Sequence, residues 1–154
     1  MGLQAIFYSA LNVPMRALLR SPLHGLASRN LCILSYAGRK SGRRFDTPLS
    51  YVREGSTIWL LSSRDTRWWT NFLPGAGAGA PVEVLAGGRS LSGRARTIQH
   101  EPARLRESVR RFLIALPRDA VVYKIGLDRE RRPVEADLQK ALARLVMVEV
   151  TLEG

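Results

Sequence analysis

Apolar and polar positions recur with two different periods along this chain of 154 residues. Apolar side chains return every three or four residues in segments 3–19 and 102–116, and again after Pro133, which predicts helices. Shorter apolar or alternating runs, separated by turns, predict β-strands. The expected strands are residues 31–36, 45–53, 57–63, 81–85, 89–99 and 146–152.

Three shorter segments complete the pattern. Residues 64–72 begin with a capping pair, Asp65–Thr66, and contain two tryptophans, which predicts a short helix. Residues 74–81 are small and rich in Gly and Ala, as is typical of a flexible loop. Residues 121–125 are too short to distinguish a strand from a helix.

Consecutive strands are joined by turns short enough for antiparallel hairpins, at Glu54–Gly55 and across Ala86–Gly88. This argues against a doubly wound parallel sheet. The pattern predicts an α+β chain that is mainly antiparallel β: a small, partly open barrel with helices packed around it. We divide it into an N-terminal amphipathic helical segment, residues 1–29, and a barrel domain, residues 30–154.

The N-terminal stripe leaves two alternatives open. With Arg16 and Arg20 on its polar face, an amphipathic helix can lie on a membrane surface, or it can pack on its own domain. No run reaches the roughly 20 apolar residues that span a bilayer, and we recognise no secretory signal. We expect a cytoplasmic protein, with peripheral contact to the inner face of the membrane through residues 1–20 as an open alternative.

The formal net charge is +11, and almost all of the cations are arginines. Such a charge suggests an anionic partner: nucleic acid, a membrane surface or an acidic small molecule. The aromatic residues lie in core-like strands, so we do not expect nucleic acid. Cys32 stands alone and His24 and His100 are far apart, so we expect no disulfide and no metal site.

Residues 38–44, Gly-Arg-Lys-Ser-Gly-Arg-Arg, carry the most informative chemistry. Glycines let backbone N–H groups approach an anion, while Arg and Lys supply charged donors. The loop therefore either holds a phosphate or a string of carboxylates, or is a solvated basic turn. It lacks the spacing of a Walker-type phosphate loop.

This loop, the run Thr47-Pro48-Leu49, the pair Ser62–Ser63 and the run Trp68–Phe72 together resemble the deazaflavin-dependent nitroreductase family. The resemblance extends from about Asn30 to Gln99. It implies a split β-barrel related to the FMN-binding pyridoxamine-phosphate-oxidase group. It also implies coenzyme F420, a 5-deazaflavin with a phospholactyl-oligoglutamate tail. The chain resembles a divergent branch described as nitroreductase or quinone reductase-like.

The resemblance implies roles for the positions that match the family's motifs. The phosphate and acidic tail would meet Arg39, Lys40, Ser41, Gly42 and Arg43. The deazaflavin ring would lie against Thr47, Pro48 and Leu49, and the ribityl chain and phosphate near Ser62, Ser63 and Arg64. The pocket would be closed by Trp69 and Asn71, although Asn71 also suits a helix cap. Phe45 stands where many members have Arg.

The implied activity is that of an oxidoreductase, in which reduced F420 gives a hydride to a quinone, nitroaromatic or enone. Because the cofactor carries the chemistry, no nucleophile or paired-carboxylate constellation is needed. Tyr123 is a weak candidate for orienting the acceptor; a tyrosine more often bonds its hydroxyl locally. Open alternatives are FMN or haem in the same cleft, or a non-catalytic module binding anions or membrane. A homodimer is also an open alternative.

Overall fold

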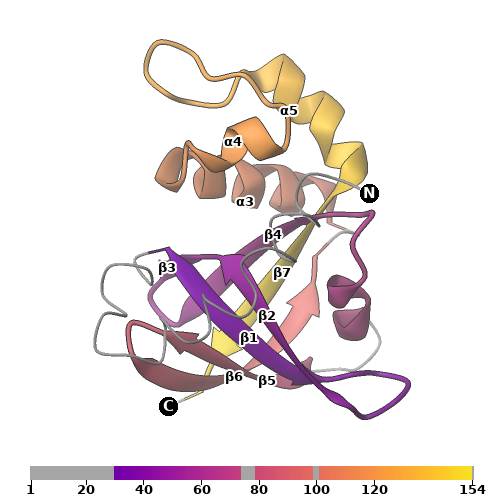
Figure 1. Cartoon of the computed structure of the whole chain (residues 1–154). Coiled ribbons are helices and arrows are strands. Elements are labelled where there is room, and N and C mark those ends of the chain that lie inside the picture. Colours follow the sequence, from indigo (N-terminus) through magenta and orange to yellow (C-terminus); the bar gives the residue numbers. More distant parts are fainter. Residues whose placement is uncertain (1–29, 74–78, 99–100, 154) are drawn as a thin grey trace.

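The computed structural model describes residues 30–73, 79–98 and 101–153, and Figure 1 shows their arrangement. Within these residues, seven antiparallel strands form one curled sheet in the order β2-β1-β5-β6-β7-β4-β3. The strands are β1 (Leu31–Ala37), β2 (Arg44–Ser50), β3 (Val52–Glu54), β4 (Thr57–Ser63), β5 (Ala80–Ala86), β6 (Arg89–Thr97) and β7 (Leu145–Leu152). The predicted split β-barrel class is confirmed.

The helices are short except for one. They are the 3-10 helix η1 (Trp68–Phe72), then α3 (Pro102–Ala115), α4 (Asp119–Val122), α5 (Glu135–Ala141) and the 3-10 helix η2 (Leu142–Arg144). In Figure 1, α3, α4 and α5 gather into one helical lobe at one end of the sheet, whereas η1 lies apart, beside the barrel. Among the described residues, no helix is long and apolar enough to cross a membrane.

Two hydrophobic cores lie on opposite faces of the sheet. The barrel core includes Leu34, Leu60 and Val148. The second core lies between the sheet and the helical lobe, where α3 places Phe112 and Leu113 against the other face. Strand β7 serves both cores, and its residues from Leu145 to Val150 are all buried. The alternation of side chains along a strand explains this division.

The strand predicted at residues 45–53 is in fact two strands. Up to Ser50 it pairs with β1, and from Val52 it pairs with β4. The described pairing with β1 ends at Leu31 opposite Ser50, and the chain then crosses to the other side of the open barrel. Tyr51 marks the corner, where its N–H donates to the carbonyl of Asn30 at 2.9 Å.

Two helix boundaries also differ from the predictions. The helix predicted at residues 64–72 begins only at Trp68, because Thr66 bonds back to the carbonyl of Ser63 instead of capping it. The last helix begins at Glu135 rather than Pro133, which forms a bridge with Leu127. The predictions for the N-terminal segment, for most of the loop at residues 74–81 and for His100 lie outside the described residues.

Candidate functional site

The basic loop between β1 and β2 is held in shape by its own backbone. The N–H of Gly38 donates to the carbonyl of Arg43 at 2.7 Å, and the N–H of Gly42 donates to the carbonyl of Gly38 at 2.9 Å. Gly42 has a φ of +70°, which favours glycine. The hydroxyl of Ser41 accepts the N–H of Arg43 at 3.2 Å, so Ser41 is used inside the loop.

An aromatic stack supports the base of this loop. The rings of Phe45 and Tyr36 are stacked, with centroids 5.8 Å apart, and the guanidinium of Arg43 lies 5.9 Å from the centroid of Phe45. A Cβ on Gly38 would come within 2.8 Å of the Phe45 ring and 2.9 Å of the Ser41 hydroxyl, so a larger residue here would displace these side chains. Tyr36 and Phe45 face each other across β1 and β2, a pairing that the sequence analysis missed. The signal that could have found it is two aromatics flanking the basic loop at hairpin spacing.

Asn71 joins the loop to helix η1. Its Oδ1 accepts the backbone N–H of Arg39 at 2.7 Å, and its Nδ2 donates to the carbonyl of Trp68 at 2.9 Å. The N-cap position of η1 is Arg67, so Asn71 does not cap the start of that helix. The side chain bridges the loop and the helix, and so holds two motifs that are distant in sequence next to each other.

A second set of bonds joins η1 to the end of β4. The indole N–H of Trp68 donates to the hydroxyl of Ser62 at 3.0 Å, and that hydroxyl lies 2.6 Å from the hydroxyl of Thr66. Ser62 has no exposed surface. Its hydroxyl is therefore used within the protein, and the neighbouring Ser63 is the partly exposed member of the pair.

Strand β2 is the terminal strand of the sheet, so its outer edge has no paired strand among the described residues. The N–H of Tyr51 points toward β1, where it bonds to Asn30. Backbone N–H and C=O groups of successive residues in a strand point to alternate sides, so those of Ser50, Pro48 and Asp46 point away from β1. Proline is tolerated at such a position because no ladder partner requires its missing N–H. The carbonyl of Pro48 thus points away from β1, although Pro48 itself is buried.

The two neighbours of Pro48 face the barrel. The hydroxyls of Thr47 and Tyr36 are 3.1 Å apart, and Leu49 is 1% exposed in the barrel core. Burial raises the pKa of the Tyr36 phenol, an effect that the hydrogen bond with Thr47 opposes. The phenol therefore stays neutral in this structure's polar network.

The cations of the loop have different surroundings. Arg44 turns toward Asp46, with Nε 3.4 Å from a carboxylate oxygen. Arg39, Lys40 and Arg43 are exposed, and no carboxylate among the described residues forms an ion pair with them. Arg64, at the end of β4, is also exposed, and its Nε lies 3.4 Å from the carbonyl of Leu145. Three loop cations are thus available to an anion.

Two predicted residues remain to be placed. The indole Nε1 of Trp69 is buried and has no hydrogen-bond partner among the described residues. An unsatisfied buried donor is costly, which makes it a candidate for a bond to a ligand. Tyr123 lies in the other core, where its hydroxyl donates to the carbonyl of Leu61 at 3.0 Å. The structure does not bring Tyr123 to the other site residues.

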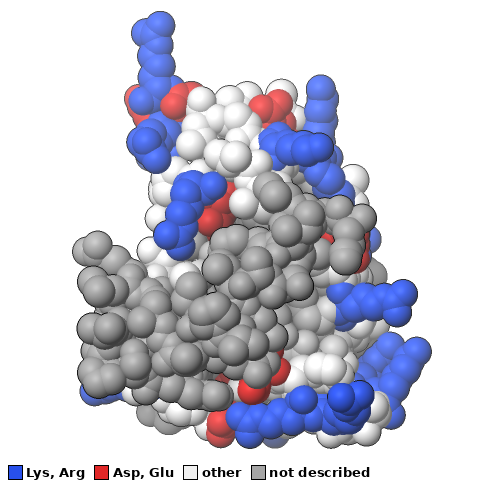
Figure 2. All heavy atoms as spheres, in the orientation of Figure 1, with Lys and Arg blue, Asp and Glu red and all other residues white. Residues whose placement is uncertain are grey.

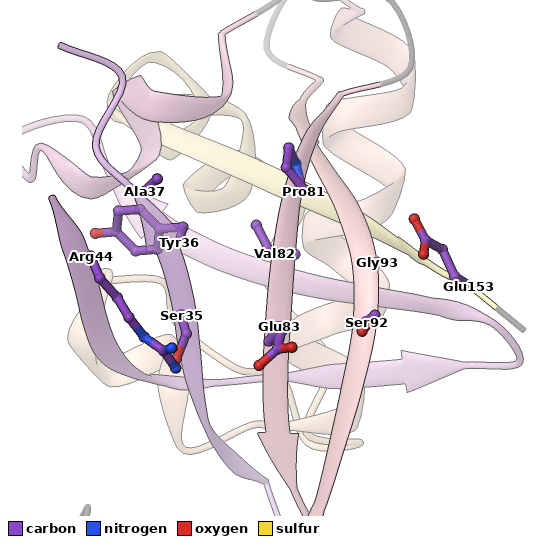
Figure 3. Close-up of a pocket in the computed structure, with 10 residues that line it drawn as sticks. All are labelled: Ser35, Tyr36, Ala37, Arg44, Pro81, Val82, Glu83, Ser92, Gly93 and Glu153. Carbon is purple, nitrogen blue, oxygen red and sulfur yellow. The ribbon is translucent and has the colours of Figure 1, made fainter. Parts of the chain in front are cut away.

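A hollow of about 390 Å³ borders this region (Figure 3). Strands β1 and β5 pair only as far as Ser35 and Glu83, and the hollow opens where they diverge. It shares Tyr36 and Arg44 with the base of the basic loop. It is lined by Ser35, Tyr36, Ala37, Arg44, Pro81, Val82, Glu83, Ser92, Gly93 and Glu153.

Comparison with known proteins gives one family. The sequence model described as F420H(2)-dependent quinone reductase matches residues 19–138. No curated protein matches the chain.

Solved structures share the fold at low identity. The protein Atu2129 of Agrobacterium tumefaciens, of unknown function, has a TM-score of 0.56 and 15% identity; the match covers 92% of this chain but 54% of that one. The conserved hypothetical protein Rv2991 of Mycobacterium tuberculosis has a TM-score of 0.54 and 17% identity, covering 82% and 75%. A putative pyridoxamine 5′-phosphate oxidase of Listeria innocua has a TM-score of 0.51 and 12% identity, covering 94% of each chain.

Proposed function

Because this chain belongs to the F420H(2)-dependent quinone reductase family, we propose that it reduces a quinone with F420H2 bound beside the basic loop. When bound, the deazaflavin supplies the hydride, and the protein supplies binding, orientation and exclusion of water. The observation that carries the proposal is the bond between Arg39 and Asn71, which unites the cationic loop with η1. Loop, helix and strand end then form one binding region.

The residues present fit a cofactor with an anionic tail. Three exposed cations, which form no ion pair with a carboxylate in the described part of the chain, stand on a loop whose backbone is already ordered. Ordering the donors before binding reduces the entropy lost when an anion is bound. The buried indole N–H of Trp69, which has no hydrogen-bond partner among the described residues, would add a neutral donor from η1. An acidic, phosphate-bearing ligand matches this donor set.

Different residues would hold different parts of the cofactor. We assign the phosphate and the carboxylates of the tail to Arg39, Lys40 and Arg43, because guanidinium and ammonium groups form charge-assisted hydrogen bonds with them. Ser63 and Arg64 would contribute from the end of β4. The polar edge of the ring would lie along β2, where the carbonyl of Pro48 points away from β1 and would accept a hydrogen bond.

Other predicted residues would act through these. Ser41 and Gly42 shape the loop, Ser62 anchors Trp68, and Asn71 holds loop to helix. Thr47 and Leu49 face the barrel, where they position the strand that carries Pro48. In this proposal all six are positioning residues. The side chains of all but Gly42 already make contacts within the protein.

A binding titration tests the cofactor assignment. F420 and FMN are added separately to the purified chain and followed by fluorescence. We expect F420 to bind at micromolar concentration or tighter, and FMN to bind more weakly because it lacks the carboxylates of the tail. Tighter binding of FMN than of F420 would contradict the assignment.

The loop is tested with Lys40→Ala combined with Arg43→Ala. Each charged hydrogen bond lost is worth roughly 1.5–3 kcal/mol, so we expect affinity for F420 to fall at least a hundredfold, or about 3 kcal/mol in all. The loss should shrink at high salt and be small for a deazaflavin that lacks phosphate and tail. Arg53→Ala combined with Arg89→Ala, which removes two exposed cations from β3 and the start of β6, is the matched control.

Acceptor preference is measured with the F420H2-loaded chain. A soluble quinone, a nitroaromatic and an enone are compared by the rate at which F420H2 is oxidised. We expect the quinone to be reduced with the highest kcat/KM. A chain that binds F420 normally but prefers the nitroaromatic would retain the cofactor assignment and overturn the proposed acceptor.

A further inference from the structure

The end of the helical lobe carries an ordered, projecting segment, residues 118–134, which we call the lobe tip. The N–H of Val134 donates to the carbonyl of Gly126 at 2.8 Å, and Leu127 forms a bridge with Pro133. Inside this small hairpin, the carboxylate of Asp128 accepts the N–H of Arg132 at 3.0 Å. The tip is therefore held in one shape by its own hydrogen bonds.

The exposed cations of the lobe tip differ from those of α3. The arginines of α3 reach carboxylates: Arg106 and Arg110 pair with Glu135 at 3.0 and 2.7 Å. Four exposed cations of the tip, in contrast, form no ion pair with any described residue. They are Lys124, Arg129, Arg131 and Arg132. The tip also carries two exposed carboxylates. Glu130 forms no ion pair with a described residue, and Asp128 accepts the backbone N–H groups of Glu130 and Arg132. The four cations outnumber these two carboxylates.

Two of these cations occupy strained backbone positions. Lys124 has a φ of +57° and Arg131 a φ of +61°, and they are the non-glycine residues with positive φ among those described. Glycine adopts this conformation without steric cost, whereas a residue with a Cβ does so at a cost. At both positions a cation stands where glycine would suit the backbone better. Such strain at a surface points to a use for the side chain.

Exposed valines accompany the cations. Val121 is 76% exposed, Val122 38% and Val134 37%. The aromatic residue of the tip, Tyr123, is 5% exposed and bonded to the carbonyl of Leu61. The tip thus presents apolar and cationic side chains without an exposed aromatic ring on which a base could stack.

We propose that the lobe tip docks the protein on an anionic lipid surface. Cations attract anionic headgroups, and small apolar side chains enter the boundary between headgroups and acyl chains. Nucleic acid would match the charge, but single strands are commonly held by exposed aromatic platforms, which the tip lacks.

The tip is separate from the cofactor region. In Figure 1 the loop after α4 and the hairpin of β1 and β2 lie at opposite ends of the molecule. In Figure 2, Lys and Arg side chains project from the end that carries the helical lobe. Docking through the tip therefore leaves the basic loop open, and the proposal does not depend on the identity of the acceptor.

Vesicle flotation of the full chain tests the proposal. Vesicles of phosphatidylcholine alone are compared with vesicles containing about one-third phosphatidylglycerol, and we expect binding only to the anionic ones. The triple variant Arg129→Gln, Arg131→Gln, Arg132→Gln should bind about ten- to a hundredfold more weakly. The matched control, Arg53→Gln, Arg89→Gln, Arg94→Gln, loses the same charge from the barrel and should bind like the unmodified chain.

A second variant separates docking from stability. Arg131→Gly removes the charge and relieves the positive φ, so it should weaken vesicle binding without lowering the midpoint of thermal unfolding. Three results would overturn the proposal: no binding of the unmodified chain to anionic vesicles, equal binding by the tip variant, or equal loss in the control variant. The proposal would also be overturned if the unmodified chain shifted nucleic acid in a gel but did not bind vesicles, and the tip variant lost that shift. The tip would then bind nucleic acid instead of lipid.

Discussion

Asn71 determines how a loop 32 residues away in sequence is held. Both ends of its amide are used: Oδ1 accepts from Arg39, and Nδ2 donates to the carbonyl of Trp68. A methyl group can do neither. The loop would then keep its internal bonds but lose its attachment to η1, so the cations would be less well placed for the cofactor.

We predict that Asn71→Ala weakens binding of F420 about tenfold, which corresponds to the roughly 1.4 kcal/mol expected for one or two hydrogen bonds. Hydrogen exchange at the Arg39 amide should become faster. Thr70→Ala is the control, because it removes a neighbouring bond to the carbonyl of Arg67 and leaves the loop attached. Unchanged exchange at Arg39 together with unchanged affinity would show that Asn71 does not position the loop.

At the scale of elements, Glu135 fastens α5 to α3. Its carboxylate accepts from Arg110 at 2.7 and 2.9 Å and from Arg106 at 3.0 Å. These hydrogen bonds, chiefly the one with Arg110, lower the pKa of Glu135 from 4.5 to about 2. The pair is exposed to solvent, so its contribution to stability is modest.

The lowered pKa gives a pH dependence with a definite sign. A carboxyl whose pKa is lower when folded stabilises the fold above its unfolded pKa, and that contribution is lost as pH falls through the folded pKa. We therefore predict that Glu135→Gln lowers the midpoint of thermal unfolding at pH 7, and that the difference from the unmodified chain shrinks between pH 4.5 and about 2. A constant difference over that interval would argue against the ion pair as its cause. Glu83→Gln, an exposed carboxyl on β5, is the control.

At the scale of the whole molecule, β7 makes the two cores one cooperative unit. Its residue Met147 lies in the core under the helical lobe, and Val148 lies in the barrel core. Neither core can be exposed without disturbing the strand they share. The molecule should therefore unfold in a single transition, as single domains of this size usually do.

We predict that Leu34→Ala in the barrel core and Leu113→Ala in the helical core each cost about 2–5 kcal/mol, since both side chains are fully buried. Both variants should lower the same single transition when unfolding is followed by near-ultraviolet and by far-ultraviolet circular dichroism. If Leu113→Ala instead produced an early transition of the helical lobe alone, the two cores would be independent.

Sequence pattern determined the elements well where one local rule applied. Alternation fixed the hairpin of β5 and β6, and the 3.6-residue period fixed α3. It failed at Tyr51 and at Thr66. There the chain changes partners or bonds backward, which depends on contacts with distant residues rather than on local preference.

For the site, the sequence by itself determined the cationic chemistry of the loop and the glycines that shape it, because these follow from residue type and turn geometry. Only the tertiary structure decided which side chains remain available. Ser62 and Asn71 matched the family's motif, yet their polar groups are bonded within the protein. The sequence also suggested Tyr123 as a candidate site residue, but the fold places it in the core under the helical lobe. A motif records which groups are present, whereas hydrogen-bond partners and burial arise from strands and helices brought together across the chain, and they decide whether a group is free to meet a ligand.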